Sequence, residues 1–139
     1  MKETLMVGLV ATALVLVAPP ARAQDKIPVN DKIELAKVDL AEGAPAELKP
    51  EFDEFFRALG QELKTQAGSF GAECNWRIFV KLVIKPKSKV VEITLDPGRS
   101  AAPRIMTTGF ARKADLGEDG FKEAIKNSVK LILTRAANC

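Results

Sequence analysis

Two stretches of the chain place apolar residues at intervals of three and four, the spacing of an α-helix with one buried face. The first has the stripe Leu48, Phe52, Phe55, Phe56, Leu59 and Leu63, and acidic residues lie early in it, where the helix dipole favours negative charge. The second runs from about Glu118 to Ala137, with the stripe Phe121, Ile125, Val129, Ile132 and Ala136. The pattern predicts two amphipathic helices.

Between these helices the apolar period changes to two, which is typical of β-strands. Every second residue from Trp76 to Ile84 is apolar, and Val91, Ile93 and Leu95 repeat this period in residues 89–96, after a break at Pro86. A third strand is expected over 104–112, although the pattern there does not decide which of its sides is buried. Three consecutive strands with short connections favour an antiparallel arrangement.

The first two strands also carry a prediction of register. A two-residue turn at Lys87 and Ser88 would place Ile84 opposite Val91, so that the apolar sides of both strands coincide. Lys-Ser is not a favoured turn pair, and a longer loop with a neighbouring register is the alternative.

The segment before the first helix has a weaker pattern. Residues 24–32 are mostly polar and include Pro28, which indicates a tether, and the faint alternation over 33–40 favours at most one short edge strand. We therefore expect an extended region over 24–43, followed by a single domain over 44–139. The fold class predicted is α+β, a two-layer sandwich in which two helices cover one face of an antiparallel sheet of three to four strands.

The amino terminus predicts export. Lys2 precedes an apolar run over 5–18, and small residues at Ala21 and Ala23 suit cleavage before Gln24. The run is shorter than the roughly 20 residues that span a bilayer, and no later stretch is apolar enough to span one. We therefore expect a signal peptide over 1–23 and a periplasmic or secreted protein without a transmembrane segment.

Two cysteines are present, Cys74 and Cys139, and both follow the predicted leader. In an oxidising compartment two such cysteines favour one intramolecular disulfide. A bridge across this loop would stabilise the fold by about 4 kcal/mol in the chain-entropy account. Redox-active or intermolecular cysteines are the alternative, but the close Cys-x-x-Cys spacing typical of redox sites is absent.

The chain contains no histidine, the commonest general base and metal ligand. Two cysteines without histidine do not make a zinc site, and the paired acids sit at helix starts, where the dipole explains them. We therefore predict no catalytic residues, no metal and no cofactor.

Cations cluster in the second half of the chain, which has a net charge of +6 from residue 67 onward. If the helices cover one side of the sheet, several of these residues line the other side with a phenylalanine among them. The predicted function is a non-enzymatic accessory or binding protein of the bacterial envelope, which binds an anionic small molecule, a glycan or an envelope protein. Nucleic acid is disfavoured by the exported location and modest net charge. The candidate residues are Arg77, Phe79, Lys81, Lys85, Arg99 and Arg104.

Three alternatives stay open. Lysines on an exposed sheet face can serve only to keep that face wet and to discourage strand addition. The loop around Ser100 could instead form the anion-recognising site of a small hydrolase or transferase. A structural envelope oligomer could form by strand addition at an edge near Ile33 to Leu40.

Overall fold

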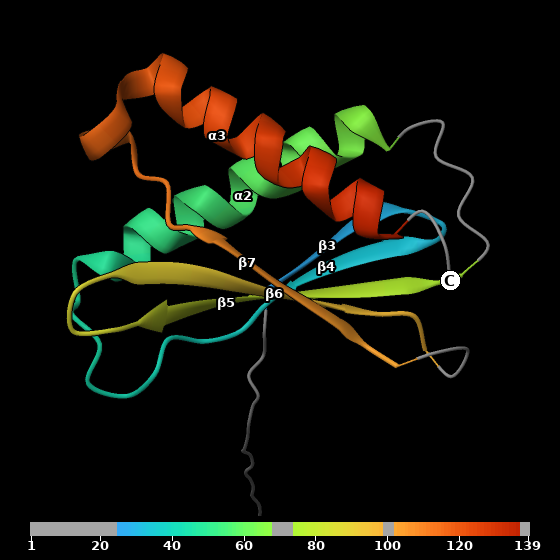
Figure 1. The fold of residues 1–139 in the computed structure, drawn as a ribbon, viewed down its shortest axis with the longest axis horizontal. Helices are drawn as coiled ribbons and strands as arrows, with labels where there is room; N and C mark the ends of the chain where they lie inside the picture. The colour runs from blue at the N-terminus through green and yellow to red at the C-terminus, as the bar shows by residue number, and fades with distance from the viewer. Residues whose placement is uncertain (1–24, 68–73, 99–101, 137–139) are drawn as a thin grey trace, which may run out of the picture.

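The residues that the structure describes form a five-stranded mixed sheet and two helices. The computed structural model describes residues 25–67, 74–98 and 102–136. In chain order the elements are β3 (Lys26–Asn30), β4 (Ile33–Lys37), α2 (Leu48–Gln66), β5 (Trp76–Ile84), β6 (Lys89–Asp96), β7 (Arg104–Gly109) and α3 (Lys113–Ala136). The strands lie side by side in that same order, and both helices lie on one side of the sheet (Figure 1). The α+β class is as predicted.

The sheet itself differs from the prediction of three to four antiparallel strands. It has five strands, and β4 and β5 run parallel, whereas the other neighbours are antiparallel. The parallel pair follows from the connection, because α2 carries the chain back over the sheet before β5 begins. Such a crossover is the usual way to join parallel neighbours.

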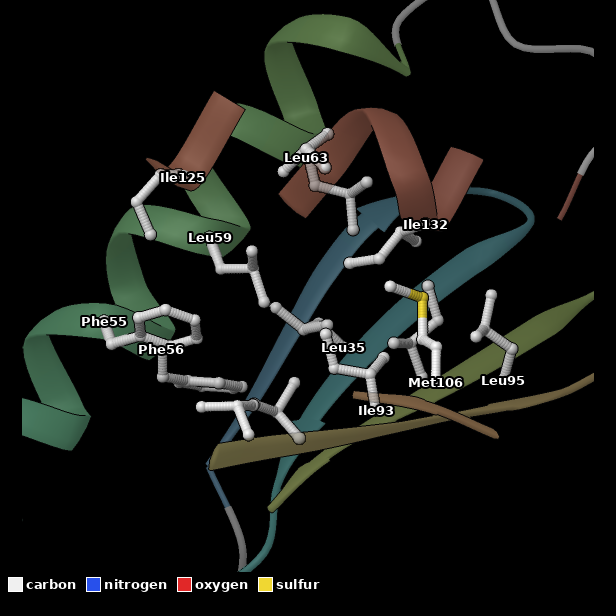
Figure 2. Packing of buried hydrophobic residues seen from close by; sticks show 14 of the residues in the cluster. Leu35, Phe55, Phe56, Leu59, Leu63, Ile93, Leu95, Met106, Ile125 and Ile132 are labelled. Carbon is white, nitrogen blue, oxygen red and sulfur yellow. The ribbon is translucent and has the colours of Figure 1, made fainter. Parts of the chain in front are cut away.

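The predicted helical stripes form the core. All six apolar residues of the α2 stripe are buried, and so are the five of α3. Leu59 from α2, Ile132 from α3 and Met106 from β7 point into the layer between helices and sheet (Figure 2). Phe110 follows β7 and packs edge-on against two α2 rings, with centroid distances of 6.2 Å to Phe52 and 5.8 Å to Phe55. Each fully buried side chain of this size contributes about 1.5–3 kcal/mol.

The segment interpreted as a tether is instead a β-hairpin. Ile27 and Val29 of β3 point toward α2, which leaves Pro28 on the other side of an outermost strand, where a missing backbone N–H is tolerated. The Asn30 side chain accepts a hydrogen bond of 2.7 Å from the backbone N–H of Lys32 and so closes the turn. The next strand, β4, lies between β3 and β5 and is not an edge.

The predicted register of β5 and β6 is wrong by two residues. Ile84 pairs with Lys89 rather than Val91, because the turn residues are Pro86 and Lys87. The backbone groups of Lys85 and Ser88 bond to each other across this turn, at 2.8 and 3.4 Å. Proline has no N–H and a fixed φ, so it suits the first turn position. A shift of two keeps every side chain on its predicted side of the sheet.

The third strand and second helix are close to their expected positions. β7 ends at Gly109, earlier than predicted, and its buried side carries Met106. α3 begins with one turn before an interruption at Gly117, where φ is 75°, and the long segment then runs to Ala136. The start of α3 is fastened to α2 by ion pairs from Arg112 to Glu51 (3.1 Å) and from Lys113 to Glu54 (3.0 Å).

Candidate functional site

The side of the sheet that faces away from both helices is the candidate site, and we call it the open face. Arg77 and Lys81 of β5 are exposed on it, and Phe79 between them is half-buried. Lys85 follows on the same side, in the turn. Neighbouring strands add residues that register places beside these: Glu34, Ala36, Val90, Glu92, Thr94, Asp96, Ile105 and Thr107.

A row across the middle of the open face is uncharged from β4 to β7, whereas its member on β3, the partner of Ala36, is Lys26. Ala36, Phe79, Thr94 and Ile105 are consecutive partners on β4, β5, β6 and β7. Ala36 is 2% exposed, whereas Ile105 at the outer end is 61% exposed. The row therefore offers an aromatic ring and a large exposed aliphatic side chain on a surface without a helix above it.

The rows on either side carry charges of both signs. Arg77 lies between Glu34 on β4 and Asp96 on β6 in the strand register. Lys81 pairs with Glu92 in the same way. Opposite charges at adjacent register positions attract across a sheet. The face predicted to be basic therefore has an acidic residue beside each of its two central cations, although no ion pair between described residues joins them.

Positive charge is instead concentrated at the tip of the β5–β6 hairpin. Lys85, Lys87 and Lys89 are all exposed there, close to the half-exposed Ile84. None of the ion pairs between described residues involves these three lysines. The tip is thus the basic end of the open face.

Arg104 lies on the helix-covered side, apart from the other candidates. Its guanidinium stacks over the Trp76 ring at 5.3 Å from the centroid, and it donates a hydrogen bond to the backbone carbonyl of Arg135. Cations suit the carbonyl end of a helix. Arg104 therefore fastens the last turn of α3 to the sheet. Arg99 and Ser100 lie outside the described residues.

Sequence reasoning missed a buried ion cluster at the end of β4. Lys37 is 8% exposed, and its ammonium group pairs with Asp53 of α2 and, at 3.0 Å, with Asp25. Burial, the strongest influence, lowers the pKa of Lys37, but the two carboxylates together outweigh it and raise the pKa above the ordinary 10.5. Lys37 also lies 6.0 Å from the centroid of the Phe56 ring. The alternation of Ile33, Leu35 and Lys37 is the signal that could have found it.

A cavity of about 320 Å³ adjoins this cluster. It is lined by Lys37, Asp53, Lys49, Phe52 and the loop over 38–46. Because the Lys37 ammonium already pairs with two carboxylates, it serves the fold rather than a ligand in the cavity.

No group of three or more metal-ligating side chains occurs within residues 25–67, 74–98 and 102–136. Neither described helix has the length and apolarity needed to cross a membrane. Comparisons with protein-family models, curated proteins and solved structures give no significant match. The case for a function therefore rests on the surface just described.

Proposed function

We propose that the protein is an exported, non-enzymatic binding protein that docks a protein partner on the open face of its sheet. The observation that carries this proposal is the row that is uncharged from β4 to β7 and contains Phe79 and Ile105, flanked by rows of charge. An apolar centre inside a polar rim is the arrangement typical of protein interfaces, and aromatic residues are enriched at their centres.

A protein partner fits this surface better than a small anion. Arg77 and Lys81 have acids at the adjacent register positions, which weakens them as an anion-binding pair. The alternating charges instead suit a broad surface whose own charges complement them. Lys85, Lys87 and Lys89 would face an acidic patch of the partner and thereby set its orientation.

Export and a disulfide belong to the same proposal. The apolar run over 5–18 followed by Ala21 and Ala23 supports export. Cys74 is buried just before β5, and Cys139, its proposed partner, lies outside the described residues. The absence of histidine from the sequence and the engagement of Lys37 by two carboxylates favour binding over catalysis.

The test is affinity capture from the native envelope extract by the immobilised protein. Phe79→Ser and Lys81→Glu alter the open face, and Lys126→Glu is the matched control, because it reverses the charge of a lysine that is also exposed but lies on α3. Trp76 fluorescence verifies folding of every variant. We expect one partner to be retained by the wild type and by Lys126→Glu and lost by both open-face variants. Capture that all variants share equally would refute the open face as the site.

Salt dependence tests the role of the hairpin tip. Replacing Lys85, Lys87 and Lys89 with serine should slow association and flatten the dependence of the rate on ionic strength, with little change in dissociation. An unchanged association rate would show that the tip does not face the partner.

A further inference from the structure

The outer edge of β7 presents unpaired backbone groups. β7 is the last strand of the described sheet, and only its β6 side is paired. Lys85 and Ser88 exchange backbone hydrogen bonds, so from this turn onward hydrogen-bonded pairs of residues alternate with non-hydrogen-bonded pairs along β5 and β6. Extending this alternation through the register to β7 directs outward the backbone groups of three residues, Ile105, Thr107 and Gly109.

The two outer strands of the sheet, β3 and β7, differ in how well they are protected against the addition of another strand. β3 carries Pro28 and packs closely on α2, where a Cβ added at Gly60 would lie 2.6 Å from the Ile27 side chain. Proline and a covering helix are two of the devices that prevent strand addition. The segment over 105–111 has neither proline nor a charged residue. β7 is therefore the edge open to another strand.

An apolar groove of about 370 Å³ runs between β7 and α3. Its lining includes Thr108, Phe110, Ala124, Ser128 and Leu131, and no lining residue is charged, in a chain of which 28% of residues are charged. Leu116 and Leu131 at its rim are 48% and 47% exposed. The hydroxyls of Thr108 and Ser128, 3.4 Å apart, satisfy each other on the inner side.

We propose that this groove and the β7 edge bind a second copy of the chain, in a symmetric dimer joined by antiparallel β7 strands. In a two-fold interface the patch packs against its own copy, so a patch carrying charges of one sign would repel itself. A charge-free patch on a highly charged protein fits that requirement. The lone strand of a peptide would cover the edge but not the leucines of the helix layer, whereas a second copy supplies both a strand and a helix.

The outward backbone groups of β7 define the register in which the two β7 strands of the dimer pair. Centring the two-fold axis at Thr107 places Ile105 opposite Gly109 of the second copy, where the glycine leaves room for the isoleucine. The two sheets then join into one, and Leu116 and Leu131 of each copy lie against the groove of the other. The open faces of both copies stay uncovered, so dimerisation and partner binding are separable.

Sedimentation of the purified full chain, in the form its host produces, tests the proposal. We expect a dimer for the wild type. Leu131→Glu puts a charge in the groove, and Thr107→Pro removes an outward N–H without touching the β6 ladder. Each should weaken the dimer by at least about tenfold. Thr134→Glu is the control, since it makes the same charge change at an exposed α3 position outside the groove lining, and it should remain dimeric.

Hydrogen exchange supplies a readout that identifies the edge. The amides of Ile105, Thr107 and Gly109 should become protected as protein concentration rises and lose that protection in Leu131→Glu. A wild type that remains monomeric at tens of micromolar, a dimer that reductant dissociates, or a dimer indifferent to both variants would each overturn the proposal. A monomer that instead binds an apolar peptide along β7 would also overturn it.

Discussion

Arg104 lies with its guanidinium 5.3 Å from the centre of the Trp76 ring, and the same group donates to the carbonyl of Arg135. One side chain thereby joins the start of β7, the start of β5 and the last turn of α3. The sequence places Arg104 among the residues for ligand binding, but the structure gives its side chain two partners within the fold, the Trp76 ring and the Arg135 carbonyl. Its substitution should therefore affect stability.

We expect Arg104→Ala to lower the free energy of unfolding by about 1–2 kcal/mol, since it removes a cation–π contact and a charged hydrogen bond. Arg104→Lys should recover only part of the loss, because lysine lacks the planar group that stacks. Trp76 is the only tryptophan and the chain has no tyrosine, so urea unfolding can be followed by its fluorescence. Arg77→Ala, at an exposed site, should change stability by less than about 0.5 kcal/mol. Equal effects of the two alanine variants would contradict this account.

Lys37→Met should destabilise the protein by about 1–3 kcal/mol, because it leaves Asp53 beside the core without its cation. Asp25 is largely exposed, which keeps the loss below that of a fully buried pair. Lys49→Met is the control, since Lys49 lines the same cavity but is exposed. Chemical denaturation measures the change in the free energy of unfolding for both variants.

The pH dependence of the Lys37 contribution follows from the direction of its pKa. The pKa is raised in the folded state, so the stabilisation is complete below the ordinary value of 10.5 and is lost as pH rises through the folded value. The stability difference between the wild type and Lys37→Met should thus be constant from pH 7 to 10 and shrink above that. A difference that shrinks between pH 7 and 9 would show that another group is responsible.

Gly60 and Ile27 should be energetically coupled. A Cβ at Gly60 would lie 2.6 Å from Cδ1 of Ile27, so Gly60→Ala forces that side chain to move despite the better helix propensity of alanine. Ile27→Val removes the colliding atom. We expect the double variant to be at least about 1 kcal/mol more stable than the two single effects predict together. Additive effects, measured by thermal unfolding of all four proteins, would mean that β3 and α2 adjust independently.

The helices and strands β5 and β6 were predictable because their apolar periods are long and unambiguous. α2 and β5 each bury one complete stripe of side chains, and burial of that stripe determines which side faces the core. β3 was missed because Pro28 and the polar residues around it resemble a tether. Its two inward residues, Ile27 and Val29, become informative only once α2 is present to cover them.

The neighbours of the candidate residues differ from those predicted, and the difference has a specific origin. The predicted register placed Thr94 opposite Lys81, whereas the turn at Pro86 brings Glu92 there. A shift of two residues preserves the apolar pattern, so hydrophobicity could not detect it, yet it changes which charges are neighbours. Glu34 could not have been placed beside Arg77 either, because the parallel pairing of β4 and β5 depends on how the chain crosses over the sheet.

The proposed bridge between Cys74 and Cys139 gives the last prediction. Without reductant the intact protein should be lighter by two hydrogens and should not react with a thiol label. Cys74→Ala combined with Cys139→Ala should lower the free energy of unfolding by about 2–4 kcal/mol, because the unfolded chain regains the freedom that the bridge removes. Reductant should lower the free energy of unfolding of the wild type by the same amount and leave that of the double variant unchanged. Two label-reactive thiols in the folded wild type would contradict the bridge, and they would also remove one support for an oxidising location.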